Sequence, residues 1–379
     1  MHQKSVTALA AAAILSSIIF GPRLCSATQL GAFDVKVLTS LTETYDDNVA
    51  YTSTSEKDDF ITRARIGLSA LYEAKTESLE LRGNIIHHKY ADYDNYDNTS
   101  EDLSVTAHKE FSAYDRAIFS DTFTHAEEPS SFEDEFGRTS GRYSYNRNRL
   151  NIAYSREFSK EFTLIARYLN DFDTYSRSDL SDSMQNRIGF EGDYMISSDT
   201  TVYGMYDFYH RDFDPGSSAT INSFSAGGRQ YLTDHTFADA GFGYDFIHSF
   251  NNKDYIKPHF SASLTDDFDQ TTRLSASFDK RYYTNASTQD LFDYWRASLA
   301  FNKRLLQRLG FNTSVFYGKG RYTTFDIKDT LKGAAAGLSY DVSDNVTAGL
   351  NYSYSKTTSN YASRAYERNT ISAGITAAF

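Results

Sequence analysis

The chain has 379 residues, a formal net charge of -12 and 1 cysteine. It is rich in aromatic residues, with 29 Tyr and 28 Phe, but it contains only 4 Pro. Aromatic residues favour strands and proline is kept out of strand ladders, so this composition favours an all-β protein. The acidic balance argues against a nucleic-acid partner, because phosphate binding needs clustered lysine and arginine.

The first 27 residues have the pattern of a secretory signal peptide. Lys4 gives a positive start, residues 8–20 form a short apolar run, and Cys25-Ser26-Ala27 fits a cleavage site. The apolar run is too short to span a bilayer as a helix, which takes about 20 residues. A lipid anchor on Cys25 is the less favoured alternative. We expect residues 1–27 to be removed and residues 28–379 to form one cysteine-free domain.

Apolar and polar residues alternate with a period of two from about residue 34 onward, as they do in strands. Residues 184–196 illustrate the pattern. Their apolar face holds Ile188, Phe190, Tyr194 and Ile196, and their polar face holds Gln185, Arg187, Glu191 and Asp193. Residues 161–173, 236–250 and 345–355 repeat it. A transmembrane barrel explains how such strands coexist with a mean hydropathy of -0.53, because lipid-facing residues alternate with lumen-facing ones.

Turn signals divide the chain into hairpins. Short polar turns are predicted near Lys75, Ala113, Lys160, Ser198, Asp234, Asp269, Gln307 and Asp344. Longer polar loops are predicted near Thr54, Asn95, Glu133, Ser178, Gly216, Asn252, Ala286, Phe325 and Asn360. These connections predict a transmembrane antiparallel β-barrel of about 18 strands, with short periplasmic turns and long extracellular loops. Because residues 34–72 are less regular, 16 strands is the alternative.

The last nine residues fit an outer-membrane barrel. Alternate positions are apolar and the final residue is aromatic, which is the pattern of a signal for barrel assembly: Ile371, Ala373, Ile375, Ala377 and Phe379. We therefore expect the barrel-assembly machinery to recognise this segment. We place the protein in the outer membrane of a Gram-negative type of cell, in contact with lipid and lipopolysaccharide.

A barrel of 16 to 18 strands encloses an aqueous channel, so the polar face should line water. The candidate pore-lining cations are Arg63, Arg65, Arg82, Arg147, Arg149, Arg167, Arg187, Arg229, Arg273, Arg281 and Arg296. The candidate anions are Glu80, Asp102, Glu191, Asp193, Asp239, Asp245 and Asp279. These charges could set a selectivity field. Alternatively, they could pair between strands and simply keep the wall polar.

Two further groups of residues have more than one interpretation. The acidic region 126–141 could fold into the pore as a constriction, bind divalent cations at lipopolysaccharide, or remain a solvated loop. A set of tyrosines could stack on sugars in the lumen, although girdles at the strand ends are the simpler interpretation. These tyrosines are Tyr90, Tyr93, Tyr96, Tyr143, Tyr145, Tyr203, Tyr206 and Tyr209.

The sequence offers no recognisable catalytic chemistry. The His are scattered, and the adjacent His87 and His88 point to opposite faces of a strand. We find no phosphate-binding glycine loop and no zinc motif. We therefore expect no enzyme activity, no catalytic residues, no metal and no cofactor.

The segment Thr42-Glu43-Thr44-Tyr45-Asp46-Asp47-Asn48-Val49, followed by an Asp-Phe-Ile strand at residues 59–61, resembles the opening of the putative β-barrel porin type 2 family. One departure is Ile66-Gly67-Leu68, where a Pro-Gly pair would be expected. The resemblance implies an outer-membrane barrel whose relatives are often encoded with exopolysaccharide export machinery. It supplies no catalytic residues.

The leading hypothesis is a water-filled conduit that exports an exopolysaccharide, with periplasmic export components setting rate and direction. A general diffusion porin for small hydrophilic solutes and a structural or adhesive surface barrel are the alternatives.

Overall fold

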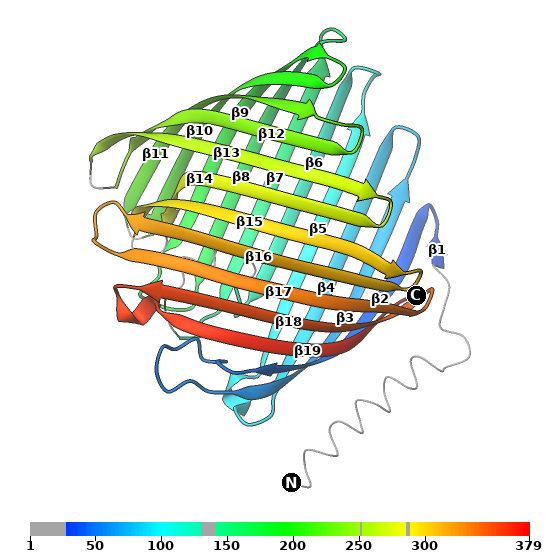
Figure 1. The fold of residues 1–379 in the computed structure, drawn as a ribbon, viewed down its shortest axis with the longest axis vertical. Helices are drawn as coiled ribbons and strands as arrows, with labels where there is room; N and C mark the ends of the chain where they lie inside the picture. The colour runs from blue at the N-terminus through cyan, green and yellow to red at the C-terminus, as the bar shows by residue number, and fades with distance from the viewer. Residues whose placement is uncertain (1–27, 130–138, 140, 215, 251, 286–288) are drawn as a thin grey trace.

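The computed structural model describes residues 28–129, 139, 141–214, 216–250, 252–285 and 289–379. They form one antiparallel β-barrel of 18 strands, β2 to β19, in which each strand pairs with its neighbours in sequence (Figure 1). The barrel closes where β19 (Tyr366–Ala378) pairs with β2 (Phe33–Asp46). A short strand, β1 (Thr28–Leu30), extends β2 as a hairpin. The predicted strand number of 18 is therefore confirmed.

The other strands run in chain order around the barrel. They are β3 (Asp59–Glu73), β4 (Glu77–Tyr90), β5 (Asn98–Glu110), β6 (Asp115–Ala126), β7 (Tyr145–Glu157), β8 (Phe162–Tyr175), β9 (Asp182–Ser197), β10 (Thr200–Asp214), β11 (Ser217–Tyr231), β12 (Thr236–His248), β13 (Asp254–Asp269), β14 (Thr272–Asn285), β15 (Asp290–Leu306), β16 (Leu309–Tyr322), β17 (Lys328–Ser343) and β18 (Val346–Ser359). Two 3-10 turns, η1 (Asp94–Tyr96) and η2 (Ala362–Arg364), lie in loops. Among the residues described, no helix is long and apolar enough to cross a membrane.

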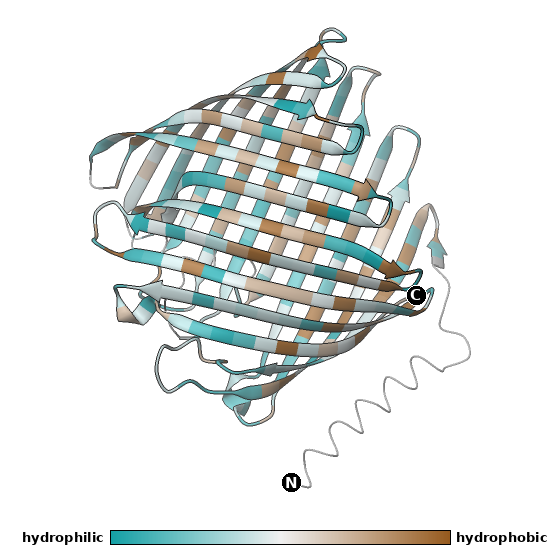
Figure 2. Ribbon diagram, in the orientation of Figure 1, coloured by the Kyte–Doolittle hydropathy of each residue, from teal (hydrophilic) through white to brown (hydrophobic). Residues whose placement is uncertain are grey.

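The period-two pattern becomes the two faces of the wall. On β9, Ile188, Phe190 and Tyr194 are exposed on the outer face, whereas Glu191 is buried on the inner face. Hydrophobic and hydrophilic residues are interspersed along many strands of the barrel (Figure 2). Neighbouring apolar residues also stack across strands, as Trp295 does between Phe278 and Tyr317. This arrangement puts aromatic area toward lipid and polar groups toward the lumen.

The connections differ between the two ends of the barrel. At the end that holds Phe379, the strands are joined by short turns such as residues 198–199 and 344–345. The opposite end carries the longer connections, notably 47–58 and 127–144. The connection predicted near Gly216 is short, because β10 ends at Asp214 and β11 begins at Ser217. By the rule that periplasmic turns are short, the end with residues 47–58 is extracellular.

The seam between β19 and β2 sets the position of the C-terminal residues. Their ladder runs from Thr370 opposite Asp46 to Ala378 opposite Leu38. It is extended by Phe379, whose N–H donates to the Val37 carbonyl at 2.9 Å and whose carbonyl accepts from the Val37 N–H at 2.7 Å. Ile371 and Ile375 point outward from this strand and are exposed. The predicted assembly residues therefore lie at the seam, and their recognition by assembly machinery stays a prediction.

One ladder is incomplete. The pairing of β13 with β14 ends at Phe260 opposite Lys280, although β13 begins at Asp254 and β14 continues to Asn285. Pro258 lies in this part of β13 and has no N–H to contribute to a ladder. The end of β14 instead keeps its pairing with β15, from Lys280 opposite Trp295 to Asn285 opposite Asp290. The wall therefore parts between β13 and β14 at the extracellular end.

Candidate pore and its inner loops

The inner wall carries the predicted charges as linked pairs of opposite sign. Glu191 accepts from Arg167 at 2.5 Å and from Arg229 at 2.5 Å, and its side chain is almost fully buried. Arg229 also contacts Asp193 at 2.9 Å and Asp239 at 3.0 Å. Four strands, β8, β9, β11 and β12, thus contribute to one network. Each charged group in it contacts a group of opposite sign.

A second set of pairs lies nearer the extracellular end of the same wall. Asp173 lies between Arg147, at 2.5 Å, and Arg211, at 3.2 Å. Arg187 contacts Asp207 at 2.9 Å. Asp173 and Asp207 are almost fully buried. Sequence reasoning did not single out Arg211, Asp173 or Asp207 as pore residues. Their alternate spacing with the other polar residues of β8 and β10 was the signal that could have identified them.

Most of the remaining predicted pore residues also have polar neighbours. Arg65 donates to Asn84 at 2.8 Å, and Asn84 donates to Asp102 at 2.7 Å. The other contacts are Arg82 with Glu80 at 2.5 Å, Arg149 with Asp171 at 3.7 Å, Arg273 with Asp267 at 3.6 Å, Arg281 with Asp279 at 3.2 Å, Arg296 with Asp279 at 3.3 Å and Asp245 with His259 at 2.9 Å. The Arg82–Glu80 and Arg281–Asp279 contacts lie within one strand, and most of the others join neighbouring strands. In both cases the predicted charges have polar partners, and their role in selectivity stays a prediction.

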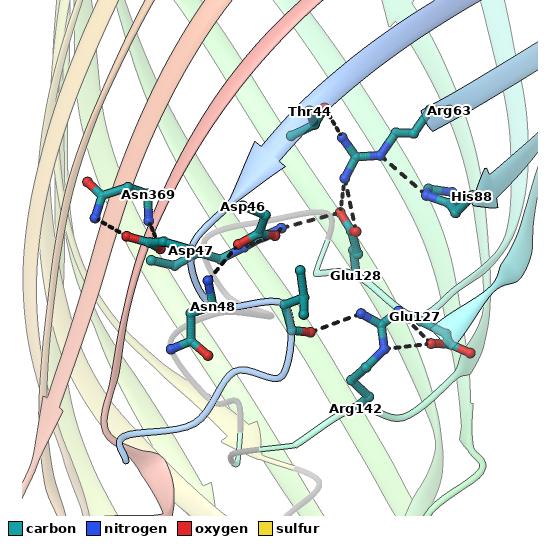
Figure 3. Close-up of polar contacts among 12 residues, drawn as sticks. Thr44, Asp46, Asp47, Asn48, Arg63, His88, Glu127, Glu128, Arg142 and Asn369 are labelled. Atoms are coloured by element: carbon teal, nitrogen blue, oxygen red, sulfur yellow. Dashed lines mark hydrogen bonds and ion pairs between the residues drawn. The ribbon is translucent and has the colours of Figure 1, made fainter. Parts of the chain in front are cut away.

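Two extracellular connections fold back inside the barrel mouth, and we call them the inner loops (Figure 3). They are residues 47–58 and the described part of the β6–β7 connection, which comprises residues 127–129, 139 and 141–144. Val49 and Tyr51 of the first loop are completely or almost completely buried. The two loops touch each other, since the Gly141 N–H donates to the Tyr51 carbonyl at 3.2 Å.

Glu128 anchors the second inner loop to the wall. Both of its carboxylate oxygens accept from the Arg63 guanidinium of β3, at 3.0 and 3.1 Å, and Arg368 of β19 lies 3.7 Å away. The same Arg63 donates to Thr44 at 2.6 Å and contacts His88 at 3.3 Å (Figure 3). Burial alone would raise the pKa of Glu128, but Arg63 and Arg368 outweigh it and hold the pKa well below its usual value.

Arg142 connects the two inner loops. Its guanidinium donates to Glu127 at 2.7 Å and to the Val49 carbonyl at 3.0 Å. It also lies over the ring of Tyr90, 5.0 Å from the centroid, in cation–π geometry. Glu127 and Glu128 are therefore not part of a solvated surface loop, and the constriction is the interpretation that they support. Glu133, Asp134 and Glu135, the other acidic residues of that region, lie outside the described residues.

The Tyr45-Asp46-Asp47-Asn48 segment ties the first inner loop to the seam. Asp46 accepts from Arg368 at 2.6 Å, and Asp47 accepts from the Asn369 amide at 2.7 Å. Asn48 is fully buried; its Nδ2 donates to the carbonyls of Thr52 and Glu367 at 2.7 and 2.8 Å. The motif that carried the family resemblance therefore has a structural role that the sequence did not predict.

The tyrosines divide between the two faces of the wall. Tyr206 lies on the outer face against Phe224, with ring centroids 4.8 Å apart, but it is in the middle of β10 and not at a strand end. Tyr90 and Tyr145 instead face inward and are almost fully buried. Tyr203 and Tyr209 also face inward, beneath Arg229 and Arg187, whose guanidiniums lie 4.5 and 4.6 Å from the ring centroids. The girdle interpretation is wrong for these four.

The arrangement offers hydrogen bonding and electrostatics rather than an evident reaction centre. Within the part of the chain that the structure describes, no group of three His, Cys, Asp or Glu side chains could hold a metal ion. Most acidic groups on the wall have a basic neighbour, so the lumen presents many donors and acceptors with little excess charge locally. Such a wall can solvate a polar solute over its whole length.

Comparison with solved structures finds other outer-membrane barrels at low identity. The FrpB iron transporter of Neisseria meningitidis (F5-1 variant) gives a TM-score of 0.50 at 11% identity, covering 85% of this chain and 62% of that one. The siderophore receptor PirA of Pseudomonas aeruginosa gives 0.46 at 12% identity, covering 91% and 80%. OccAB3 of Acinetobacter baumannii gives 0.47 at 11% identity, covering 92% and 100%.

The likeness to FrpB concerns the fold alone, and this chain spans less than two thirds of that protein's length. No curated protein matches the sequence. The family model described as "Putative beta-barrel porin 2" matches residues 26–379, which is nearly the whole chain. Together with the closed 18-stranded barrel and its polar lumen, this match places the protein in the outer membrane. The chain belongs to the Putative beta-barrel porin 2 family.

Proposed function

We propose that this outer-membrane porin is a conduit through which an exopolysaccharide leaves the cell. The observation that carries the proposal is the pairing of charges on the inner wall, from Arg167 and Glu191 to Arg187 and Asp207. Pores that select ions gather like charges into rings. A wall of compensated pairs has a weak net field but keeps many hydrogen-bonding groups, and these suit a polymer that carries hydroxyls along its whole length.

The inner loops support the same function. They narrow the extracellular mouth, and they are fastened by ion pairs such as Arg63–Glu128 rather than by covalent links. A fastened loop can hold the resting lumen narrow and still yield to a chain that threads through it. In this proposal periplasmic export components deliver the polymer and supply the driving force, while the barrel contacts lipid and lipopolysaccharide around it.

The first test is the conductance of the folded mature protein in planar bilayers, with neutral and acidic polysaccharides added to one side at a time. The conduit predicts a steady conductance that a polysaccharide blocks from one side. A steady conductance that polysaccharides do not affect would contradict it and favour a diffusion porin for small solutes. No conductance, from protein whose folding is verified by heat-modifiable gel mobility, would favour a surface structural role.

A further inference from the structure

A cavity of about 260 Å³ lies in the lumen beside the parting of β13 and β14. Its walls come from β9 to β13 on one side and from β14 and β15 on the other. The volume is slightly below the range of about 300–1,000 Å³ that is usual for small-molecule sites. The cavity is distinct from the inner loops, none of whose residues lines it.

The described residues beside the β14–β15 connection are tied to strands on the other side of this cavity. Gln289 in this connection donates to Ser181, in the β8–β9 connection, at 2.5 Å. It accepts from Ser217, at the start of β11, at 2.9 Å. Arg211 on β10 donates to the Thr284 carbonyl at 3.4 Å. These contacts lie at the end of β14 that has no ladder bonds to β13.

Small residues on the opposite wall keep the space open. Ser223, Ser225, Gly241 and Ser261 line the cavity from β11, β12 and β13. A Cβ added at Gly241 would come within 2.5 Å of the Tyr203 hydroxyl, so this position has no room for a side chain unless Tyr203 moves. Close packing normally fills such spaces in protein interiors. A gap that is lined by small residues on one side and by the tyrosines of β14 and β15 on the other has the form of a binding site.

The chemistry of the lining matches a sugar ring. Tyr209, Tyr282 and Tyr294 contribute aromatic surface, and the negative face of an aromatic ring attracts the polarised C–H groups of a pyranose. Asp245 and Arg281 contribute hydrogen-bonding groups. Asp245 contacts His259 at 2.9 Å and Arg281 contacts Asp279 at 3.2 Å, so both groups already have a polar partner. Polar groups that are held by partners in this way favour a neutral polyhydroxyl over a small ion.

We propose that this cavity is a saccharide-binding subsite that holds one pyranose unit of the exported polymer against Tyr282 and Arg281. The inference rests on the proposed function, because the conduit is what brings a polysaccharide to the cavity. It adds a defined point of contact part of the way along the lumen. Sugar units would stack there as they pass, and the binding would favour pyranose rings over flexible polymers without rings.

The test is binding of maltohexaose, cellohexaose and oligogalacturonate to the folded mature protein, measured by isothermal titration calorimetry and by blocking events in single-channel recordings. Tyr282→Leu keeps an apolar side chain but removes the ring, and Arg281→Gln removes the charge of a half-exposed side chain. The matched control is Tyr206→Leu, on the outer face. We expect both cavity variants to weaken binding of a neutral oligomer by tenfold or more, and the control to bind like the unmodified protein.

Failure of this subsite can be told apart from failure of the conduit. If long polysaccharides block the unmodified protein and both cavity variants equally, the subsite is refuted and the conduit is not. If oligomer binding depends on Tyr282 and Arg281 but no polymer passes, the subsite is supported and the conduit is refuted. If none of the three oligomers binds the unmodified protein, or if Tyr206→Leu weakens binding as much as Tyr282→Leu, the subsite is refuted.

Discussion

At the residue scale, Glu128 fastens one of the two inner loops at the barrel mouth to the wall. It is the counter-ion of Arg63, and Arg368 lies next to it, so two guanidiniums share one carboxylate. The sequence contains Glu128 within a run of acidic residues that looks solvated. Its partners lie on β3 and β19, far away in the sequence, and only the closure of the barrel brings them together.

Glu128→Gln should loosen the second inner loop. The amide cannot compensate Arg63 and Arg368, and lost hydrogen bonds to a charged group cost about 1.5–3 kcal/mol. We expect a higher mean conductance and larger current noise in planar bilayers. Glu161→Gln is the control, because Glu161 lies in a periplasmic turn near Ser159. Unchanged conductance and noise in Glu128→Gln would show that Glu128 does not hold the loop.

The pH dependence of the mouth follows from the same carboxylate. Because the pKa of Glu128 is lower in the folded protein than in the unfolded chain, its contribution to stability is fully present above the unfolded value of about 4.3. That contribution is lost only as the pH falls toward the lower folded value. We therefore expect current noise to stay constant from pH 7 to about pH 5. A Glu128-dependent rise in noise between pH 7 and pH 5 would contradict the assignment.

Asn48 is the second residue whose loss should be costly. Its buried side chain donates hydrogen bonds to the carbonyls of Thr52 and Glu367 and accepts one from the Thr52 N–H at 3.0 Å. In Asn48→Ala these backbone groups lose their hydrogen-bond partner. Each group that stays without one lowers the free energy of unfolding by about 1–3 kcal/mol. We expect a lower denaturant midpoint in urea unfolding. Asn95→Ala, at an exposed loop position, should leave the midpoint unchanged; equal midpoints in the two variants would refute the anchoring role.

At the scale of elements, strand faces follow from sequence but departures from regular pairing do not. The alternation in residues 184–196 predicted β9 and its lumen-facing Glu191, because one buried face fixes the register. The parting of β13 from β14 has no comparable local signal apart from Pro258. It depends on contacts of Gln289 with Ser181 and Ser217, which are distant in the chain. Tyr282 thus could not be assigned to a cavity from periodicity.

Strands β15 and β16 illustrate how one element limits another. Gly320 on β16 lies opposite Tyr294 on β15. A Cβ added at Gly320 would come within 2.0 Å of the Phe292 ring. Phe292 is fully buried in a cluster with Tyr322 and Leu331. Gly320→Ala should therefore displace this ring and destabilise the barrel by about 1–3 kcal/mol, as overpacking does. Urea unfolding measures this change.

Gly349→Ala is the matched control for that substitution. Gly349 also lies within a strand, but the nearest atom to its added Cβ would be 3.8 Å away, at ordinary contact distance. We expect Gly349→Ala to leave the unfolding midpoint close to that of the unmodified protein. A Gly320→Ala protein as stable as Gly349→Ala would show that the cluster around Phe292 can readjust without loss.

At the scale of the whole molecule, the number of strands and the polar lumen could be predicted because a barrel repeats one simple rule along each strand. The predicted turns mark the hairpins at the end that holds Phe379, and the charged residues alternate with the outer aromatic ones. The sequence could not predict which segments fill the lumen. The inner loops and the contacts of Gln289 join residues that are far apart in the chain. Such contacts leave no periodic pattern in the sequence.

Paired charges would matter for transport in the proposed conduit. A polymer in the lumen would meet Arg167–Glu191–Arg229 and then Arg187–Asp207, where donors and acceptors lie side by side. No single pair would bind the polymer strongly, so many weak contacts would replace its hydration without trapping it. This balance suits passage of a long neutral chain. A channel with one dominant charge would hold a polymer of the opposite charge.

The release of a labelled polysaccharide from proteoliposomes is the most direct test of whether a polymer passes through this barrel. Vesicles with the folded protein would be loaded with a fluorescent linear dextran much longer than the barrel, a labelled trisaccharide and a labelled folded protein as a leakage control. If the barrel is a polymer conduit, dextran and trisaccharide both leave through it while the folded protein is retained. Release of the trisaccharide alone, with the dextran retained as in vesicles without the barrel, would contradict polymer export and leave a pore for small solutes.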